Sequence, residues 1–210
     1  MITVFKAGGP AGPSGQAGSH ALREPRGWYS RGYLPHYDQP ELLQSITYRL
    51  ADSLPTETLA QIEEELQHTD PRRHELERRK HLEAWLDSGR GSCVLREPRA
   101  AQCILDNWHR FQGERYDLVA WVIMPNHVHV LIRVYEGVTL ARIVQSWKSY
   151  TSRRIGLLAR EGSVVKPQRS AAVWAREYWD RYVRNERHYA AVVAYIHDNP
   201  VKAGLVQQSE

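Results

Sequence analysis

Residues 127–134 follow a strict alternation that fixes their local structure. β-Branched residues occupy the even positions from 128 to 134, and the odd positions hold His127, His129, Leu131 and Arg133. Successive side chains of a strand point to opposite faces of a sheet, so the segment predicts a strand with one apolar face. Residues 116–123 predict a second strand, and residues 124–126 (MPN) a tight connection, because proline is excluded from a central strand. The two strands predict a hairpin with both histidines on the opposite face, which we expect to be open.

The histidine pair has the spacing of a metal site. Residues two apart in a strand have Cβ atoms about 7 Å apart, so the imidazoles of His127 and His129 can converge on one cation. However, the chain has 10 histidines, and such pairs arise readily by chance. On this pair alone, two surface histidines without a metal are the simpler interpretation.

The remaining periodic segments predict one more strand and several helices. Residues 44–50 alternate as a half-buried strand, with Ile46, Tyr48 and Leu50 on one face. Helices are predicted over residues 56–87, broken near Asp70-Pro71, and over residues 97–111. Two later helices are predicted from apolar stripes, which comprise Leu140, Ile143, Val144, Trp147 and Thr151, then Tyr189, Val192, Val193 and Ile196. Pro200 should end the last helix, and residues 162–170 and 174–183 should form a polar loop and an aromatic-rich connection. The order predicts an α+β fold, an antiparallel sheet with helices on one face.

Composition restricts the class of protein. A hydrophobic content of 42% and a charged content of 25% are typical of globular domains, and there is no run of about 18 apolar residues to span a membrane. Cys93 and Cys103 lack zinc-site spacing, and no signal segment is evident, so a bacterial cytoplasm is the expected setting. Residues 1–26 are rich in glycine and proline, and we expect them to be disordered. Residues 27–206 then form the functional domain, and residues 207–210 a tail.

Charge favours an anionic partner. The formal net charge is +4, and basic residues cluster in residues 148–160 and 176–187, whereas acidic ones concentrate in residues 63–70. Local clustering of this kind is expected of a protein that docks on phosphates.

Tyr195 and Asn199 lie four residues apart in the last predicted helix, so they share one side. A tyrosine there is usually a residue at the edge of the core, with its hydroxyl in water. The functional alternative is a phenolate nucleophile assisted by a metal ion, with the Asn199 amide oxygen completing the ligand set that two histidines leave open.

Four segments resemble single-tyrosine transposases. Residues 121–131 (WVIMPNHVHVL) resemble their HUH motif, which is histidine, hydrophobic residue, histidine. Residues 195–205 (YIHDNPVKAGL) resemble the tyrosine helix of the branch associated with repetitive extragenic palindromes (REP). Residues 147–152 (WKSYTS) and 174–181 (WAREYWDR) resemble other segments of the same branch. All four occur in the family's order, and the resemblance extends from about residue 31 to residue 206.

The resemblance implies a ferredoxin-like or RRM-like sheet with the HUH motif on a central strand. It implies an enzyme in which Tyr195 attacks a phosphate of single-stranded DNA, leaving a 5′-phosphotyrosine and a free 3′-hydroxyl. One Mg²⁺ or Mn²⁺ ion would be held by His127, His129 and Asn199. The expected partner is a REP-type DNA hairpin, and the expected state is a monomer, with a homodimer as the alternative, associated with the nucleoid when acting.

Other residues are weaker candidates. Phosphate contacts are assigned to Arg49, Lys148, Arg153, Arg154 and Lys202, although a solvated basic helix face accounts for several of them equally well. Trp174 is assigned to base stacking, as are Tyr178 and Trp179, with core packing expected for at least one of the three. Asp180 is assigned to the outer sphere of the metal site, with an ion pair to Arg181 or Arg184 as the alternative. His36, His188 and His197 are expected to be incidental.

Residues 55–90 exceed what a minimal transposase of this type needs, and they predict a helical insertion that does not touch the active site. Two other functions stay open. An RRM-like protein that only binds structured single strands is one, and a hydrolase that uses metal-activated water is the other.

Overall fold

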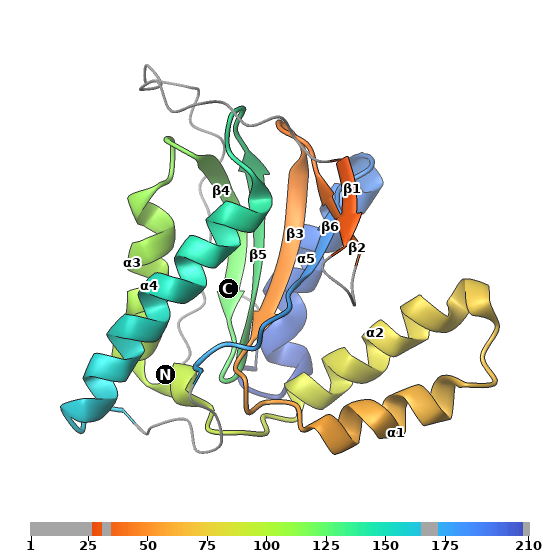
Figure 1. Ribbon diagram of the computed structural model, residues 1–210, viewed down its shortest axis with the longest axis horizontal. Helices are drawn as coiled ribbons and strands as arrows, with labels where there is room; N and C mark the ends of the chain where they lie inside the picture. The colour runs from red at the N-terminus through yellow and green to blue at the C-terminus, as the bar shows by residue number, and fades with distance from the viewer. Residues whose placement is uncertain (1–26, 31–34, 165–171, 208–210) are drawn as a thin grey trace.

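The computed structural model describes residues 27–30, 35–164 and 172–207 (Figure 1). The predictions for residues 1–26, for most of the polar loop and for residues 208–210 fall outside these ranges. No helix among the described residues is long and apolar enough to cross a membrane.

An antiparallel sheet forms the centre of the molecule. Its strand order is β4-β5-β3-β6, with the bounds β3 (Leu43–Arg49), β4 (Tyr116–Ile123), β5 (His127–Val134) and β6 (Trp179–Tyr182). β4 and β5 form the predicted hairpin, and β5, which carries both histidines, is central as predicted. β6 lies within the segment predicted to be a connection. It is an edge strand of four residues paired only with β3, too short to show a reliable alternation. A separate hairpin of β1 (Gly27–Ser30) and β2 (Pro35–Asp38) was also not predicted.

Two helices cover one face of the sheet. They are α3 (Pro98–Arg110) and α4 (Leu140–Arg160), with the short 3₁₀ turn η1 (Val94–Arg96) ahead of α3. All five residues of the predicted α4 stripe are buried, against the face of β5 that carries Val128, Val130 and Ile132. The α+β class and the helical layer on this face are therefore confirmed.

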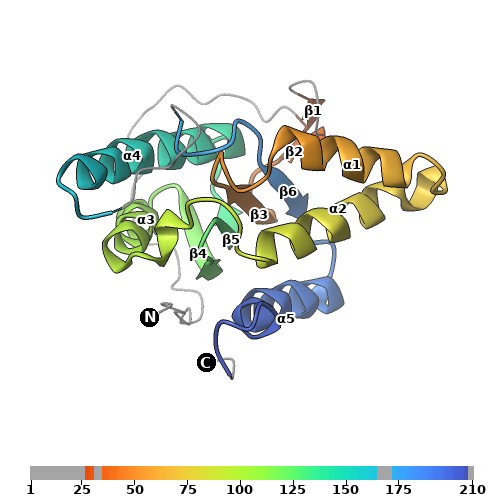
Figure 2. The same cartoon turned by 90° about the horizontal axis from the view of Figure 1, so that it is seen from below.

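The opposite face was expected to be open, but α5 (Glu186–Lys202) covers it. Figure 2 shows α5 on the other side of the sheet from α3 and α4. Ile196 is fully buried there in an apolar cluster with Ala120, Val122 and Leu131. Leu131 of β5 and Ala120 and Val122 of β4 lie on the same face as the histidines and are apolar, and this second apolar surface requires a cover.

Two details of the last helix differ from the prediction. Tyr189 is 38% exposed, so the buried face begins only at Val192. Pro200 does not end the helix, which continues to Lys202. Proline removes one backbone donor, but the next turn still closes through bonds from Ala203 N to Asn199 O at 3.0 Å and from Leu205 N to Pro200 O at 2.9 Å.

The predicted insertion is a helical hairpin of α1 (Thr56–Leu66) and α2 (Pro71–Asp87). The break at Asp70-Pro71 is confirmed. Ile62, Leu66 and Leu82 bury the helices against each other, and Trp179 of β6 packs on this cluster. The C-terminal end of α2 therefore lies beside the sheet and α5 (Figures 1 and 2).

Candidate active site between the sheet and the last helix

The two histidines of β5 converge on one point. Their Nε2 atoms are 3.1 Å apart, and His127 and His129 are only 1% and 2% exposed. The alternative of two surface histidines is therefore wrong. Burial lowers the pKa of His127 to about 3 and that of His129 well below its ordinary value, so both rings are neutral near pH 7. Neutral imidazoles are the form that binds metal ions.

The other ring nitrogens are held by polar partners. Nδ1 of His127 lies 2.7 Å from Oδ1 of Asn126, and Nδ1 of His129 lies 2.7 Å from Oγ1 of Thr47. The Asn126 amide donates to the carbonyls of Leu86 and Arg90, so its oxygen faces His127 and accepts the Nδ1 proton. This tautomer leaves the Nε2 lone pair of His127 free for a ligand.

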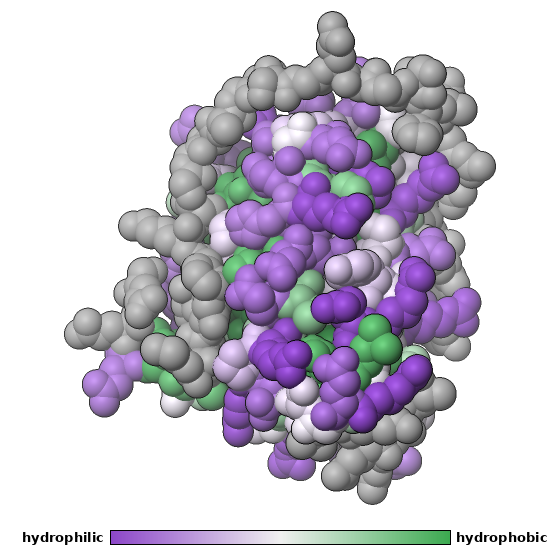
Figure 3. Space-filling model, turned by 90° about the vertical axis from the view of Figure 1, so that its left-hand side faces the viewer, coloured by the Kyte–Doolittle hydropathy of each residue, from purple (hydrophilic) through white to green (hydrophobic). Residues whose placement is uncertain are grey.

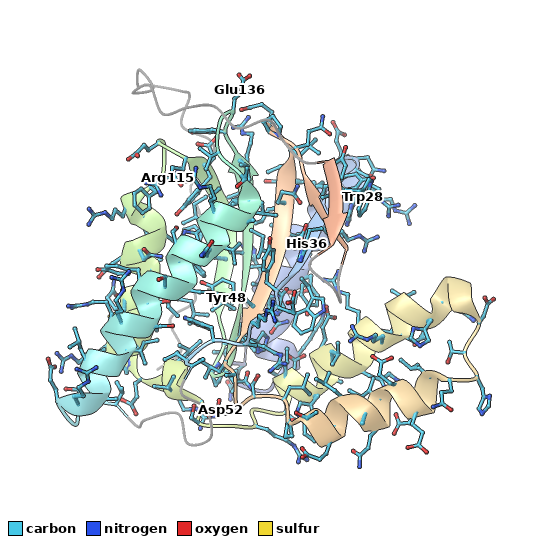
Figure 4. All side chains as sticks on the ribbon, viewed as in Figure 1. Trp28, His36, Tyr48, Asp52, Arg115 and Glu136 are labelled. Carbon is cyan, nitrogen blue, oxygen red and sulfur yellow. The ribbon has the colours of Figure 1, made fainter. Side chains whose placement is uncertain are left out.

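Sequence reasoning assigned this outer sphere to Asp180, and the assignment is wrong. Asp180 pairs with Ile46 on β3, whose side chain lies on the face covered by α4, so it points away from His129. Its carboxylate bonds instead to the His36 ring and, at 3.2 Å, to Tyr37 N, which ties β2 to β6 (Figure 4). The alternative partners Arg181 and Arg184 are not used, and His36 is not incidental. The sequence alone could have pointed to Asn126 as a partner of the histidines, because this residue directly precedes the HUH motif. Thr47 could be identified only from the register of β3 against β5, which pairs it with His129.

Tyr195 and Asn199 share one side of α5, as their spacing predicted, and that side faces the histidines, as the resemblance implied. The rings of His129 and Tyr195 are 5.1 Å apart, and the Asn199 amide lies 3.4 Å from Nε2 of His129. Asn199 is fully buried, and among the described residues its Oδ1 has no hydrogen-bond partner. Since the two ends of an amide exchange by rotation, Asn199 can present its oxygen to a cation at this point.

The Tyr195 hydroxyl is not in water, contrary to the simpler interpretation of this residue. The hydroxyl oxygen is buried, and burial raises the pKa of the phenol well above its ordinary value. The carboxylates of Glu83 and Asp87 on α2 raise the pKa further, whereas Arg79 acts in the opposite direction. Tyr195 is therefore a neutral phenol near pH 7 in this arrangement.

The donors present fit a divalent metal ion. Two imidazole nitrogens and an amide whose oxygen has no hydrogen-bond partner among the described residues surround one point, which matches the donor types that several divalent ions accept. As the side chains stand, no group of three His, Cys, Asp or Glu residues in the described ranges is arranged as a metal site, and the Asn199 amide oxygen would be the third donor beside the two histidines.

Two of the predicted DNA-contact residues lie next to this site. Nζ of Lys202 lies 5.3 Å from the centre of the Tyr195 ring. Arg49 is the strand partner of His127, and burial lowers its pKa to about 10 while its Nη1 donates to Leu50 O at 3.2 Å.

The other predicted contacts lie elsewhere. Nζ of Lys148 donates to the carbonyls of residues 175, 176 and 177 at 3.0–3.2 Å, which is a structural role. Trp174 is 4% exposed, and its Nε1 donates to Thr151 Oγ1, so it is a core residue and offers no stacking surface. Tyr178 is likewise buried, as predicted for at least one of the aromatic residues. Arg153 and Arg154 are exposed on α4, across the sheet from the histidines.

Known proteins match the part of the chain that carries this site. The family model described as "Transposase IS200 like" matches residues 102–199. A REP-associated tyrosine transposase of Escherichia coli (strain K12) is 31% identical over 98 residues, which cover 44% of this chain and 49% of that protein. A Haemophilus influenzae protein whose name places it in the same group is 28% identical over 94 residues, which cover 44% of this chain and 53% of that protein. The chain thus spans about half the length of the curated relatives it matches.

A solved structure confirms the fold. The structure of a REP-associated tyrosine transposase bound to a REP hairpin superimposes with a TM-score of 0.51 at 17% identity. The match covers 83% of this chain and 75% of that chain. It therefore extends beyond the segment that the family model matches.

Proposed function

We propose that this chain is an enzyme that cuts and rejoins single-stranded DNA through Tyr195, because residues 102–199 match the family model of IS200-like transposases. One observation carries the proposal. His127, His129, Asn199 and Tyr195, from a strand and a helix far apart in sequence, meet at one buried point. A protein that only binds nucleic acid has no need of this convergence.

The proposed reaction is a transfer of a phosphodiester to the protein. The Tyr195 hydroxyl oxygen forms a bond to phosphorus, and the bond from phosphorus to the 3′-oxygen breaks. The phenol loses its proton during this step, since its raised pKa keeps it protonated beforehand. The leaving 3′-oxygen gains one proton and becomes a hydroxyl, so the number of protons is unchanged. The 5′-phosphotyrosine retains the energy of the broken bond, so the 3′-hydroxyl can attack it and rejoin the DNA.

His127, His129 and Asn199 would hold Mg²⁺ or Mn²⁺. A bound divalent ion would supply electrostatic stabilisation of the charge that builds up on the phosphate. The Lys202 ammonium beside the Tyr195 ring favours the phenolate that forms during attack. Arg49 would contact a phosphate next to the one that reacts, which its pairing with His127 across the strands supports.

The proposed substrate is a REP-type hairpin with adjoining single-stranded DNA. This proposal rests on the names of the curated relatives and on the hairpin bound in the similar solved structure. We further propose that residues 27–206 act as one domain and as a monomer on DNA in the bacterial cytoplasm.

A covalent adduct tests the proposal directly. Incubated with a labelled single-stranded hairpin oligonucleotide and Mn²⁺, the protein should form an adduct that survives a denaturing gel. Tyr195→Phe and EDTA should each abolish it, and His127→Ala should abolish cleavage while leaving most DNA binding, since phosphate contacts elsewhere supply the affinity. Tyr189→Phe, on the same helix but 38% exposed, is the matched control and should form the adduct normally.

The alternatives give different results in the same assay. Cleavage that persists in Tyr195→Phe without an adduct would indicate hydrolysis by metal-activated water. Binding of the hairpin without any cleavage would indicate an RRM-like binding protein.

A further inference from the structure

The C-terminal turn of α2 faces the proposed active site. Glu83 and Asp87 lie one turn apart on one side of α2, and both carboxylates act on the Tyr195 hydroxyl of α5. Oδ1 of Asp87 lies 3.8 Å from Nε2 of His127. That oxygen is itself buried, although the side chain is 24% exposed, and among the described residues it has no hydrogen-bond partner. A buried carboxylate oxygen without a donor calls for an explanation.

The proposed metal site lacks a negative charge. His127, His129 and Asn199 are all neutral donors, and two of the three are nitrogens. Mg²⁺ and Mn²⁺ are hard ions that prefer oxygen ligands, and protein sites for Mg²⁺ normally include one or two carboxylates. Three neutral donors alone therefore make a poor site for these ions, and one carboxylate would correct this.

The spacing of the donors is that of ligands to one ion. Two donors bound about 2.1 Å from a common ion lie between about 3 Å and 4.2 Å apart, depending on the angle between them. The His127–His129 and His127–Asp87 donor distances are 3.1 and 3.8 Å. The Asn199 Nδ2 atom, whose place the ligand oxygen takes when the amide rotates, lies 3.4 Å from Nε2 of His129. All three fall within this range without a rearrangement of the backbone.

One side chain fixes both Asp87 and His127. Asn126 accepts from Nδ1 of His127 through its oxygen, and its nitrogen donates to the carbonyls of Leu86 and Arg90, which flank Asp87. The end of α2 is thereby held in register with the histidine ring. The expectation that the helical insertion does not touch the active site is therefore wrong.

We propose that Asp87 of the α1–α2 insertion is an anionic ligand of the metal ion held by His127, His129 and Asn199. This inference rests on the proposed function, since it requires the histidine site to bind a metal. The role of the insertion is then to supply a charged ligand, which the sheet and α5 do not provide.

Calorimetric titration of the whole chain with Mn²⁺, without DNA, tests this assignment. Asp87→Asn should weaken Mn²⁺ binding by at least about tenfold, since loss even of a residue that only supports a ligand costs about 10–100-fold. The rise in unfolding temperature that Mn²⁺ produces in the native protein should shrink in the same variant. In EDTA the variant should unfold at the native temperature or above, because the change is isosteric and removes a charge beside Glu83.

Asp106→Asn is the matched control. Asp106 is exposed on α3, across the sheet from the site, and its carboxylate accepts a hydrogen bond from Gln102 Nε2 at 2.7 Å. This variant should bind Mn²⁺ with native affinity.

The two hypotheses fail in different ways. If His127→Ala loses Mn²⁺ binding and Asp87→Asn keeps native affinity, the Asp87 assignment is overturned and the histidine site stands. If His127→Ala keeps native affinity, the proposed metal site is overturned together with the inference.

Discussion

At the scale of single residues, the orientation of each imidazole depends on one neighbour. Thr47 is the strand partner of His129 and is 6% exposed, and its hydroxyl oxygen lies 2.7 Å from Nδ1 of the ring. Asn126 does the same for His127. Both contacts turn Nε2 toward the point where Asn199 and Tyr195 arrive from α5. A ring that lost its contact would be free to rotate, and the convergence would be lost with it.

Thr47→Val should therefore weaken Mn²⁺ binding although Thr47 is not a ligand. Valine has the same shape but cannot bond to Nδ1 of His129, and the expected loss of affinity is about 10–100-fold. The buried nitrogen left without a partner should also cost about 1–3 kcal/mol of unfolding free energy. Calorimetry with Mn²⁺ and urea unfolding measure the two effects. Thr47→Ser keeps the hydroxyl and should restore most of the affinity, and native binding in Thr47→Val would show that the contact is not needed.

At the scale of elements, one cation of α4 binds the described residues that lead into β6. Lys148 of α4 donates to three successive carbonyls of residues 175–177 and lies 5.3 Å and 5.7 Å from the rings of Tyr178 and Tyr48. Tyr48 lies on β3, under this part of α4 (Figure 4). The ammonium group thus connects α4, the sheet and the start of β6, which no spacing along the chain indicates.

Lys148→Met should lower stability by about 2 kcal/mol, since hydrogen bonds made by a charged donor contribute about 1.5–3 kcal/mol. Urea unfolding measures this. Arg154→Met, which changes an exposed residue of the same helix, should stay within about 0.5 kcal/mol of the native protein. The salt dependence of oligonucleotide binding should be unchanged in Lys148→Met. A slope of log affinity against log salt that fell by about 0.7 would show a phosphate contact instead.

At the scale of the whole molecule, the sheet separates two surfaces. The proposed active site lies on the side of α5 and α2. On the other side, a groove between α3 and α4 is lined by Arg110, Phe111, Arg142, Tyr150 and Arg153, with Tyr150 38% exposed. Figure 3 shows this side of the molecule, where hydrophilic residues surround smaller hydrophobic areas. Basic and aromatic groups together suit a single strand or a hairpin loop.

Arginine substitutions in this groove should weaken DNA binding without affecting the chemistry. The double variant Arg142→Ala and Arg153→Ala should reduce the salt slope of oligonucleotide binding by about 0.7 for each lost phosphate contact. At saturating oligonucleotide, adduct formation should proceed at the native rate, because the sheet lies between the groove and Tyr195. Arg73→Ala removes a positive charge from an exposed residue of α2 and is the control for the loss of charge itself. A native salt slope in the double variant would exclude the groove as a DNA surface.

The sequence by itself determined the local structure and the candidates for the reacting groups. Alternation set the β4–β5 hairpin and the shared face of His127 and His129, and helical spacing set the shared side of Tyr195 and Asn199. Both are properties of neighbours along one element, which backbone geometry alone dictates.

Only the tertiary structure decided what surrounds those groups. The cover of α5 over the histidine face, the contact of Thr47 with His129 and the approach of Asp87 to His127 join segments up to about 80 residues apart. The same holds for Asp180, whose face of the sheet depends on the pairing of the short strand β6. Such contacts follow from strand register and helix packing, in which a shift of one residue would turn every side chain to the other face. For this reason the proposed nucleophile and its metal ligands could be predicted, whereas their supporting residues and the fourth ligand could not.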